Sequence, residues 1–174
     1  MAKVNQLQLE DFFTHHLPYE YDMLRGAAAL LAQLPLPSKT EKAEITIQRN
    51  SLIESCGIHA RNLIEFFKNK DSCDFEPRYF TEQGYKLKKS FVRSTLVDKI
   101  NYQISHLTRN RTRVAEEKLT GGDIIELVRV IGAEMDRMLR SLRRAWGAKN
   151  EITIGTVIVG SFLLGASSEV SSGR

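Results

Sequence analysis

Hydrophobic positions recur at helical spacing through most of the first 146 residues. The segment from Pro18 to Leu34, "PYEYDMLRGAAALLAQL", has a proline where a first helical turn tolerates one, and then a run of strong helix formers. Pro35 and Pro37 follow, and they cannot continue the hydrogen-bond ladder of a helix. We therefore expect a first helix over residues 18–34.

A second, longer helix is predicted from about Glu41 to Lys68. Its apolar residues recur at three, four and seven positions and form one stripe; they are Ile45, Leu52, Ile53, Cys56, Ala60, Leu63, Ile64 and Phe67. The opposite face carries Glu54, Arg61 and Glu65, whose spacing predicts a ladder of charges. His59 lies near the buried side, so we expect a packed histidine with a hydrogen-bonded nitrogen.

The sequence after residue 68 predicts a long loop and two more helices. Residues 69–89 are rich in turn formers, and their aromatic residues either pin the loop to the bundle or belong to a functional segment; these are Phe75, Tyr79, Phe80 and Tyr85. A third helix is expected over 91–109, with Leu96, Ile100, Ile104 and Leu107 buried and Val97 at the margin. A fourth begins at "TGGD", with Asp123 as N-cap, and continues to Trp146. The fold class is all-α, an up-and-down bundle of four main helices.

The composition changes this picture little. With 174 residues, 42% of them hydrophobic, the chain can bury one core, and we expect one helical domain over 1–150 followed by an apolar, then Ser/Gly-rich tail over 151–174. The apolar run 152–166 is shorter than the ~20 residues of a membrane span, so no span is expected. Peripheral attachment or self-association through this run are the alternatives.

Cysteine usage and the first residues favour a reducing compartment. The two cysteines, Cys56 and Cys73, are too few for a disulfide framework, and neither they nor the histidines have the spacing of a metal site. The opening "MAKVNQLQLEDFF" lacks the apolar core of an export signal. We therefore expect a cytoplasmic protein with no metal and no cofactor.

Positive charge is concentrated in the second half of the chain. The formal net charge of +4 favours polyanion binding only weakly. Seven arginines nevertheless cluster there: Arg109, Arg111, Arg113, Arg137, Arg140, Arg143 and Arg144. Contact with a nucleic acid and a solvated helix face are equally good explanations of this set.

One side of the predicted third helix could carry acid–base chemistry. At about 100° per residue, Lys99, Tyr102, His106 and Arg109 share a side of this helix, whereas Asn101 projects elsewhere. Neighbouring cations disfavour the charged imidazole, so His106 could accept a proton near pH 7 while Lys99 and Arg109 hold a phosphate. These groups would suit metal-independent RNA cleavage. A lone histidine beside a core stripe is, however, more often structural or solvated.

Two segments carry a resemblance to a known family. "SLIESCGIHARNLIEFF" and "INYQISHLTRNR" resemble the second and third helices of the HEPN superfamily, and more narrowly a bacterial branch of small proteins related to abortive-infection HEPN proteins. The resemblance covers roughly residues 17–146. It implies an all-α bundle that pairs into a homodimer, with the motif helices of the two subunits facing each other across a cleft.

The resemblance also implies a site. Active HEPN members cleave RNA without a metal, using an arginine and a histidine separated by four to six residues. The histidine carries over to His106, but the arginine position holds Asn101 or Lys99, and a lysine lacks the planar fork with which arginine grips phosphate. The implied catalytic residues are His106, Lys99 and Asn101, and the RNA-binding residues are Tyr102, Arg109, Arg111 and Arg113.

Two functions follow from these observations. The first is an RNA-binding HEPN-like homodimer that acts as an endoribonuclease in a defence or toxin–antitoxin type system. The alternative is a non-catalytic HEPN-like dimeric interaction module that docks a protein partner or holds RNA without cutting it. The missing arginine favours the second.

Overall fold

The computed structural model describes residues 5–68, 75–88, 91–101 and 118–153, and helices are the main regular elements of these residues. No strand occurs among these residues, although one isolated β-bridge joins Thr81 to Leu142. The prediction of an all-α protein is therefore confirmed. Within the same residues, no helix combines the length and the apolar character needed to cross a membrane. Most of the apolar run 152–166 lies outside the described residues.

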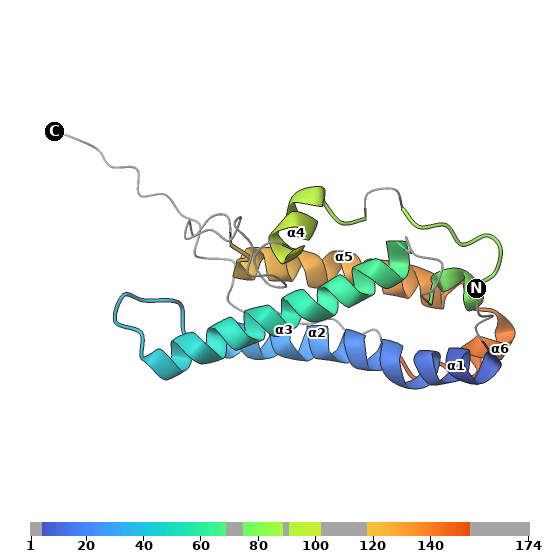
Figure 1. Ribbon diagram of the computed structural model, residues 1–174, viewed down its shortest axis with the longest axis horizontal. Helices are drawn as coiled ribbons and strands as arrows, with labels where there is room; N and C mark the ends of the chain where they lie inside the picture. The colour runs from blue at the N-terminus through green and yellow to red at the C-terminus, as the bar shows by residue number, and fades with distance from the viewer. Residues whose placement is uncertain (1–4, 69–74, 89–90, 102–117, 154–174) are drawn as a thin grey trace.

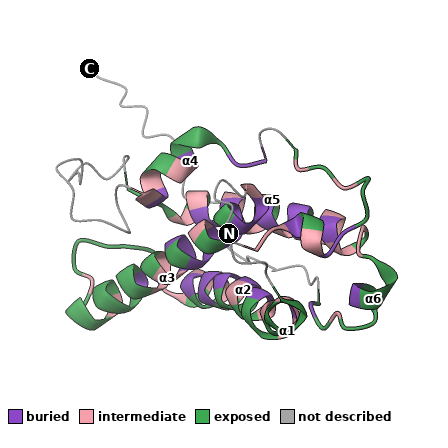
Figure 2. Cartoon of the chain, turned by 45° about the vertical axis from the view of Figure 1, so that its right-hand side comes forward, coloured by how far each residue is buried: buried purple, intermediate pink, exposed green. Residues whose placement is uncertain are grey.

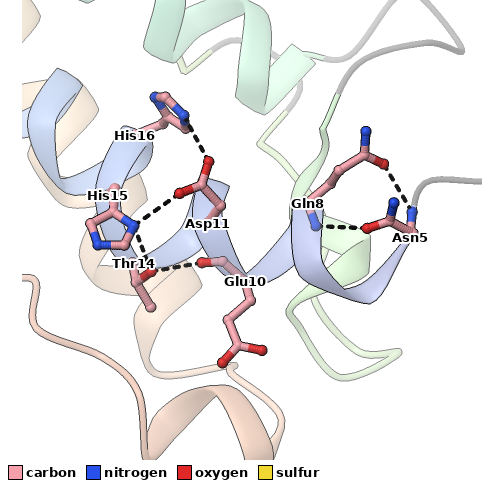
Figure 3. A network of polar contacts seen from close by, with 7 residues as sticks. All are labelled: Asn5, Gln8, Glu10, Asp11, Thr14, His15 and His16. Carbon is pink, nitrogen blue, oxygen red and sulfur yellow. Dashed lines mark hydrogen bonds and ion pairs between the residues drawn. The ribbon is translucent and has the colours of Figure 1, made fainter.

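The first predicted helix is α2, Leu17–Gln33, and it ends where the prolines require. It continues without a break from α1, Gln6–Asp11, through a π-helical turn over Phe12–His16, so the helical run begins well before Pro18. A capping box starts α1: Asn5 accepts from the backbone N–H of Gln8, and the Gln8 side chain accepts from the backbone N–H of Asn5 (Figure 3).

The second predicted helix is α3, Ala43–Lys68, close to the expected bounds. It runs antiparallel to α2, and the two helices lie side by side (Figure 1). The C-terminal part of its predicted apolar stripe is buried, from Cys56 to Phe67, while Leu52 and Ile53 are half-buried. On its outer face Arg61 pairs with Glu65 as predicted.

Residues 75–88 form the described part of the predicted loop, and their aromatic residues do pin it to the bundle. Phe80 is fully buried against Phe13 and Trp146, with ring centroids 5.1 and 5.0 Å away. The backbone N–H of Glu82 donates to the Ser141 carbonyl at 2.8 Å, and that of Arg143 donates to the Phe80 carbonyl at 3.0 Å. Within residues 75–88 the one regular element is a 3₁₀ turn, Pro77–Tyr79.

The third predicted helix is described only at its start. It begins as α4, Ser94–Lys99, and continues through Ile100 and Asn101. Leu96 and Ile100 are buried as expected. Ile104 and Leu107 lie outside the described residues.

The fourth predicted helix is wrong at both ends. α5 spans Gly121–Leu139, its N-cap is Thr120, and Asp123 is the third residue of a capping box with Thr120 rather than the N-cap. The helix also stops at Leu139 instead of reaching Trp146. The chain turns there because residues 141–143 pair with the loop at residues 80–82, and Trp146 lies in a separate short helix, α6, Arg144–Gly147.

The core lies between α2, α3 and α5, where the buried residues of each helix face inward (Figure 2). Its fully buried side chains include Leu24, Leu63, Leu127, Ile131 and Met135. α6 closes the α1 end, since Trp146 packs on Phe13. Three long helices thus enclose the core among the described residues, and most of the predicted third helix lies outside them.

Candidate functional site

The sequence predicted a site of seven residues on the third helix and directly after it. Lys99 and Asn101 lie among the described residues, and Asn101 is half-buried. The remaining five lie outside the described residues, and their roles stay predictions; they are Tyr102, His106, Arg109, Arg111 and Arg113.

Lys99 has a partner within the fold. Its Nζ lies 2.7 Å from Oδ2 of Asp123, and the side chains are only 23% and 13% exposed. The same carboxylate oxygen accepts from the backbone N–H and the hydroxyl of Thr120 at 2.9 and 2.8 Å. Burial alone would raise the pKa of Asp123, but the hydrogen bonds from Lys99 and Thr120 outweigh it, so the pKa lies below its ordinary value. Lys99 therefore ties α4 to the start of α5.

Arg137 also makes contacts inside the protein. It pairs with Glu134 and donates to the Lys86 carbonyl at 2.6 Å, and its guanidinium lies over the Tyr85 ring, 5.2 Å from the centroid. Tyr85 Oη donates to the buried Glu134 Oε1 at 2.6 Å. This network fastens the loop to α5.

Two of the three arginines that follow Arg137 along the chain also contact other groups of the protein. Arg140 pairs with Asp136. Arg143 donates to the carbonyls of Thr81 and Arg78 at 2.8 and 2.6 Å. Arg144 is exposed at the start of α6. Three of the four arginines between 137 and 144 thus have intramolecular partners, which reduces the positive charge that they offer to a polyanion.

His59 is packed and hydrogen-bonded, as the sequence predicted. It is buried, and its Nδ1 lies 2.7 Å from Oε2 of Glu20 on α2. Asn62 Nδ2 donates to the same oxygen at 3.0 Å. The edge of the Tyr19 ring meets the imidazole with centroids 5.6 Å apart. This cluster joins α2 to α3.

The His15 and His16 pair shares one carboxylate in the π-helical turn. Asp11 Oδ1 lies 3.1 Å from His15 Nδ1, and Oδ2 lies 3.1 Å from His16 Nε2 (Figure 3). All three side chains are exposed. The described residues contain no group of three or more His, Cys, Asp or Glu placed to hold a metal ion.

Sequence reasoning missed a groove between the start of α2 and the end of α3. It has a volume of about 390 Å³. Three phenylalanines and two leucines give it an apolar floor, and four polar side chains stand at its rim; the lining residues are Phe12, His16, Leu17, Glu20, Asn62, Leu63, Glu65, Phe66 and Phe75. This mixture of a broad apolar surface and a few polar groups is typical of ligand sites.

Sequence reasoning also missed an exposed apolar surface on the same two helices. We name it the outer apolar face, and it consists of Tyr19, Met23 and Leu30 on α2 and Ile47 and Ile58 on α3. Spacings of four and seven place the α2 members on one side of that helix, and eleven residues, three turns, separate the α3 members. The contact between Tyr19 and His59, next to Ile58, joins the two rows.

Comparisons of the chain with protein-family models, with curated proteins and with solved structures find no match. A function for this chain is therefore inferred from its fold and from the contacts of its side chains.

Proposed function

We propose that this chain is a HEPN-like helical interaction module that forms a homodimer through the outer apolar face of α2 and α3. The observation that carries the proposal is the exposure of five large apolar side chains along this helix pair, Tyr19 at 55% and Ile58 at 47% among them. Exposed apolar side chains that gather on one part of a protein surface mark interaction sites.

The outer apolar face fits the centre of an interface with a second copy of the chain. It covers twelve residues of each helix, 19–30 and 47–58, which is a length of about 18 Å, and two adjacent helices are about 20 Å wide. The product is about 360 Å² per subunit, so the polar surface around the face must supply the rest of the about 800 Å² per subunit of a standard interface. A two-fold dimer buries the same patch on both subunits, so one apolar face is sufficient to form it.

The partners of Lys99 favour a non-catalytic role. A lysine that binds a phosphate in the transition state would have to leave Asp123 without its cation, and this carboxylate is mostly buried. The partners of Arg137, Arg140 and Arg143 likewise hold the loop and α5 together. RNA cleavage by His106 remains the competing prediction from the sequence.

Analytical ultracentrifugation of two variants tests the dimer. We expect a wild-type dimer at tens of micromolar, and a monomer for Met23→Lys and for Ile58→Lys, because a buried unpaired charge is costly at an interface. Leu7→Lys is the control, since Leu7 is more exposed but lies outside the face, on α1. A monomeric wild type, or a dimer that both face variants leave intact, would refute the proposal.

An RNA assay separates the module from the nuclease. Wild type and His106→Ala are incubated with single-stranded RNA in EDTA, over a range of salt concentrations. The module predicts no cleavage by either protein. Cleavage by wild type that His106→Ala abolishes, while the dimer persists, would assign the nuclease function instead.

A further inference from the structure

The groove at the start of α2 has a floor of aromatic rings. Phe12 stacks on Phe75 with centroids 4.3 Å apart, and Phe66 lies 5.4 Å from Phe12. Phe75 belongs to the loop after α3, so three segments of the chain meet here. The face of an aromatic ring carries the negative part of its quadrupole, so a ring face that borders a groove attracts cations.

The rim of the groove is acidic. Glu20 comes from α2 and Glu65 from α3, and none of the described residues that line the groove is a lysine or an arginine. Glu20 Oε2 is positioned by His59 and Asn62, and Glu65 Oε1 accepts from Arg61 Nε at 2.7 Å. The carboxylates are therefore oriented by the fold before any ligand arrives, which reduces the entropy cost of binding.

We infer that this groove binds an arginine side chain that a protein partner presents next to an apolar residue. The guanidinium would stack on the phenylalanines and donate to Glu20 and Glu65, and the neighbouring apolar residue would cover Phe75. Arginine fits better than lysine because its planar, weakly hydrated cation stacks on rings and donates to two acceptors at once. A volume of about 390 Å³ is at the lower end for ligand pockets and suits one or two side chains.

The inference goes beyond the proposed dimer and is independent of it. The groove is lined by residues within 12–20 and 62–66 and by Phe75, whereas the outer apolar face lies over residues 19–30 and 47–58. Both surfaces lie on the same helix pair, one after the other along its length. Each can therefore be altered without changing the side chains of the other.

Isothermal titration calorimetry with three capped peptides tests the ligand chemistry. The probes are acetyl-Phe-Arg-Phe-amide, its glutamine analogue and acetyl-arginine-amide. We expect the first to bind at least about five-fold more tightly than the second, because a cation between carboxylates and aromatic faces gains attraction that a neutral amide lacks. We also expect it to bind more tightly than the third, which has no apolar neighbour, and to lose affinity as salt rises.

Variants of residues inside and outside the groove test whether the peptide binds there. Glu65→Gln should weaken binding of the arginine peptide about three- to ten-fold, whereas Glu54→Gln, an exposed carboxylate on the same helix but outside the lining residues, should leave it unchanged. Phe75→Leu should weaken it as well, through loss of the ring. Glu65→Gln is the primary test because the Glu65 side chain is 59% exposed and the variant will fold.

Two results would overturn the inference. One is equal affinity for the arginine and glutamine peptides, and the other is an equal effect of Glu65→Gln and Glu54→Gln. Repeating the titration with Ile58→Lys separates this inference from the proposed dimer. Tight binding by that variant supports the groove even if the dimer proposal fails, and a wild-type dimer without peptide binding refutes the groove alone.

Discussion

Lys99 at the end of α4 and Asp123 in the first turn of α5 connect these two helices, with Nζ 2.7 Å from Oδ2. Asp123 also closes the capping box of α5 with Thr120. The Asp123 carboxylate therefore accepts a hydrogen bond from the N-cap residue of α5 and also binds the Lys99 cation at the end of α4. Lys99, which the sequence predicted to bind a phosphate, therefore links α4 to α5 in the fold.

Removing the Lys99 cation should destabilise the protein. We expect Lys99→Gln to lower the free energy of unfolding by about 1–2 kcal/mol, because it leaves a mostly buried carboxylate with fewer hydrogen bonds. The measurement is urea denaturation followed by circular dichroism. Lys39→Gln is the control, since Lys39 is exposed in the connection between α2 and α3, and it should change stability by less than about 0.5 kcal/mol. Equal losses in both variants would contradict a junction role for Lys99.

The same carboxylate should make the protein sensitive to acid. The pKa of Asp123 is lower in the folded protein than its ordinary value of about 3.9. The unfolded chain therefore binds this proton first as the pH falls, so the stabilisation is complete above about pH 5 and is lost as the pH falls through the folded pKa. Glu41, whose pKa is lowered by its hydrogen bond from Arg49, acts in the same direction.

Asp123→Asn tests this pH dependence. Urea titrations at pH 7 and at pH 3 should show a smaller loss of stability on acidification for the variant than for wild type, because asparagine does not titrate. Wild type should be the more stable of the two at pH 7. An identical loss on acidification in both proteins would show that Asp123 does not contribute to acid sensitivity.

The sequence predicted helices well where the apolar period was long and uninterrupted. The 26 residues of α3 were located to within two residues at its start. The end of the fourth helix was missed because Leu142 and Trp146 continue the period of α5. Both positions are instead packed by contacts with the distant residues Phe80 and Thr81, which no local pattern can indicate.

The sites were harder to predict because they combine residues from separate elements. Glu20 and Asn62 are 42 positions apart and share a hydrogen bond only because α2 and α3 are antiparallel. The α2 part of the outer apolar face could have been predicted from the sequence, because Tyr19, Met23 and Leu30 have helical spacing. In an alanine- and leucine-rich helix, however, spacing alone does not tell which apolar stripe faces the core.

The loop before α4 should depend on the hydrogen bond between Tyr85 and Glu134. Glu134 is 3% exposed, and burial is the main reason that the pKa of Tyr85 is raised, with the hydrogen bond to Glu134 adding to it. We expect Tyr85→Phe to lower the free energy of unfolding by about 1–2 kcal/mol, because a buried carboxylate loses a donor while the ring is kept.

Tyr79→Phe is the matched control for Tyr85→Phe. Tyr79 belongs to the same loop and is also half-buried, and its ring packs against Phe80. Chemical denaturation should show a loss of less than about 0.5 kcal/mol for this variant. A loss as large as that of Tyr85→Phe would mean that removal of either tyrosine hydroxyl destabilises the loop, and that the effect of Tyr85→Phe is not specific to its hydrogen bond with Glu134.

Cys56 should be inert in the folded protein. It is fully buried beside Leu24, and burial raises the pKa of its thiol to about 12. At pH 8 only about one thiol in ten thousand is then the reactive thiolate, and reagent reaches it only when α2 and α3 separate. In a Cys73→Ser background, a disulfide reagent should therefore modify Cys56 at least about a hundred-fold more slowly in buffer than in 8 M urea.

Two further variants test whether access requires opening of the helix pair. Leu63→Ala removes packing between α2 and α3 and should raise the rate of labelling in the native protein, whereas Glu54→Gln on the exposed side should not. Fast labelling of the native background protein would mean that this helix pair opens readily, and the groove and the outer apolar face would then lose their rigid support.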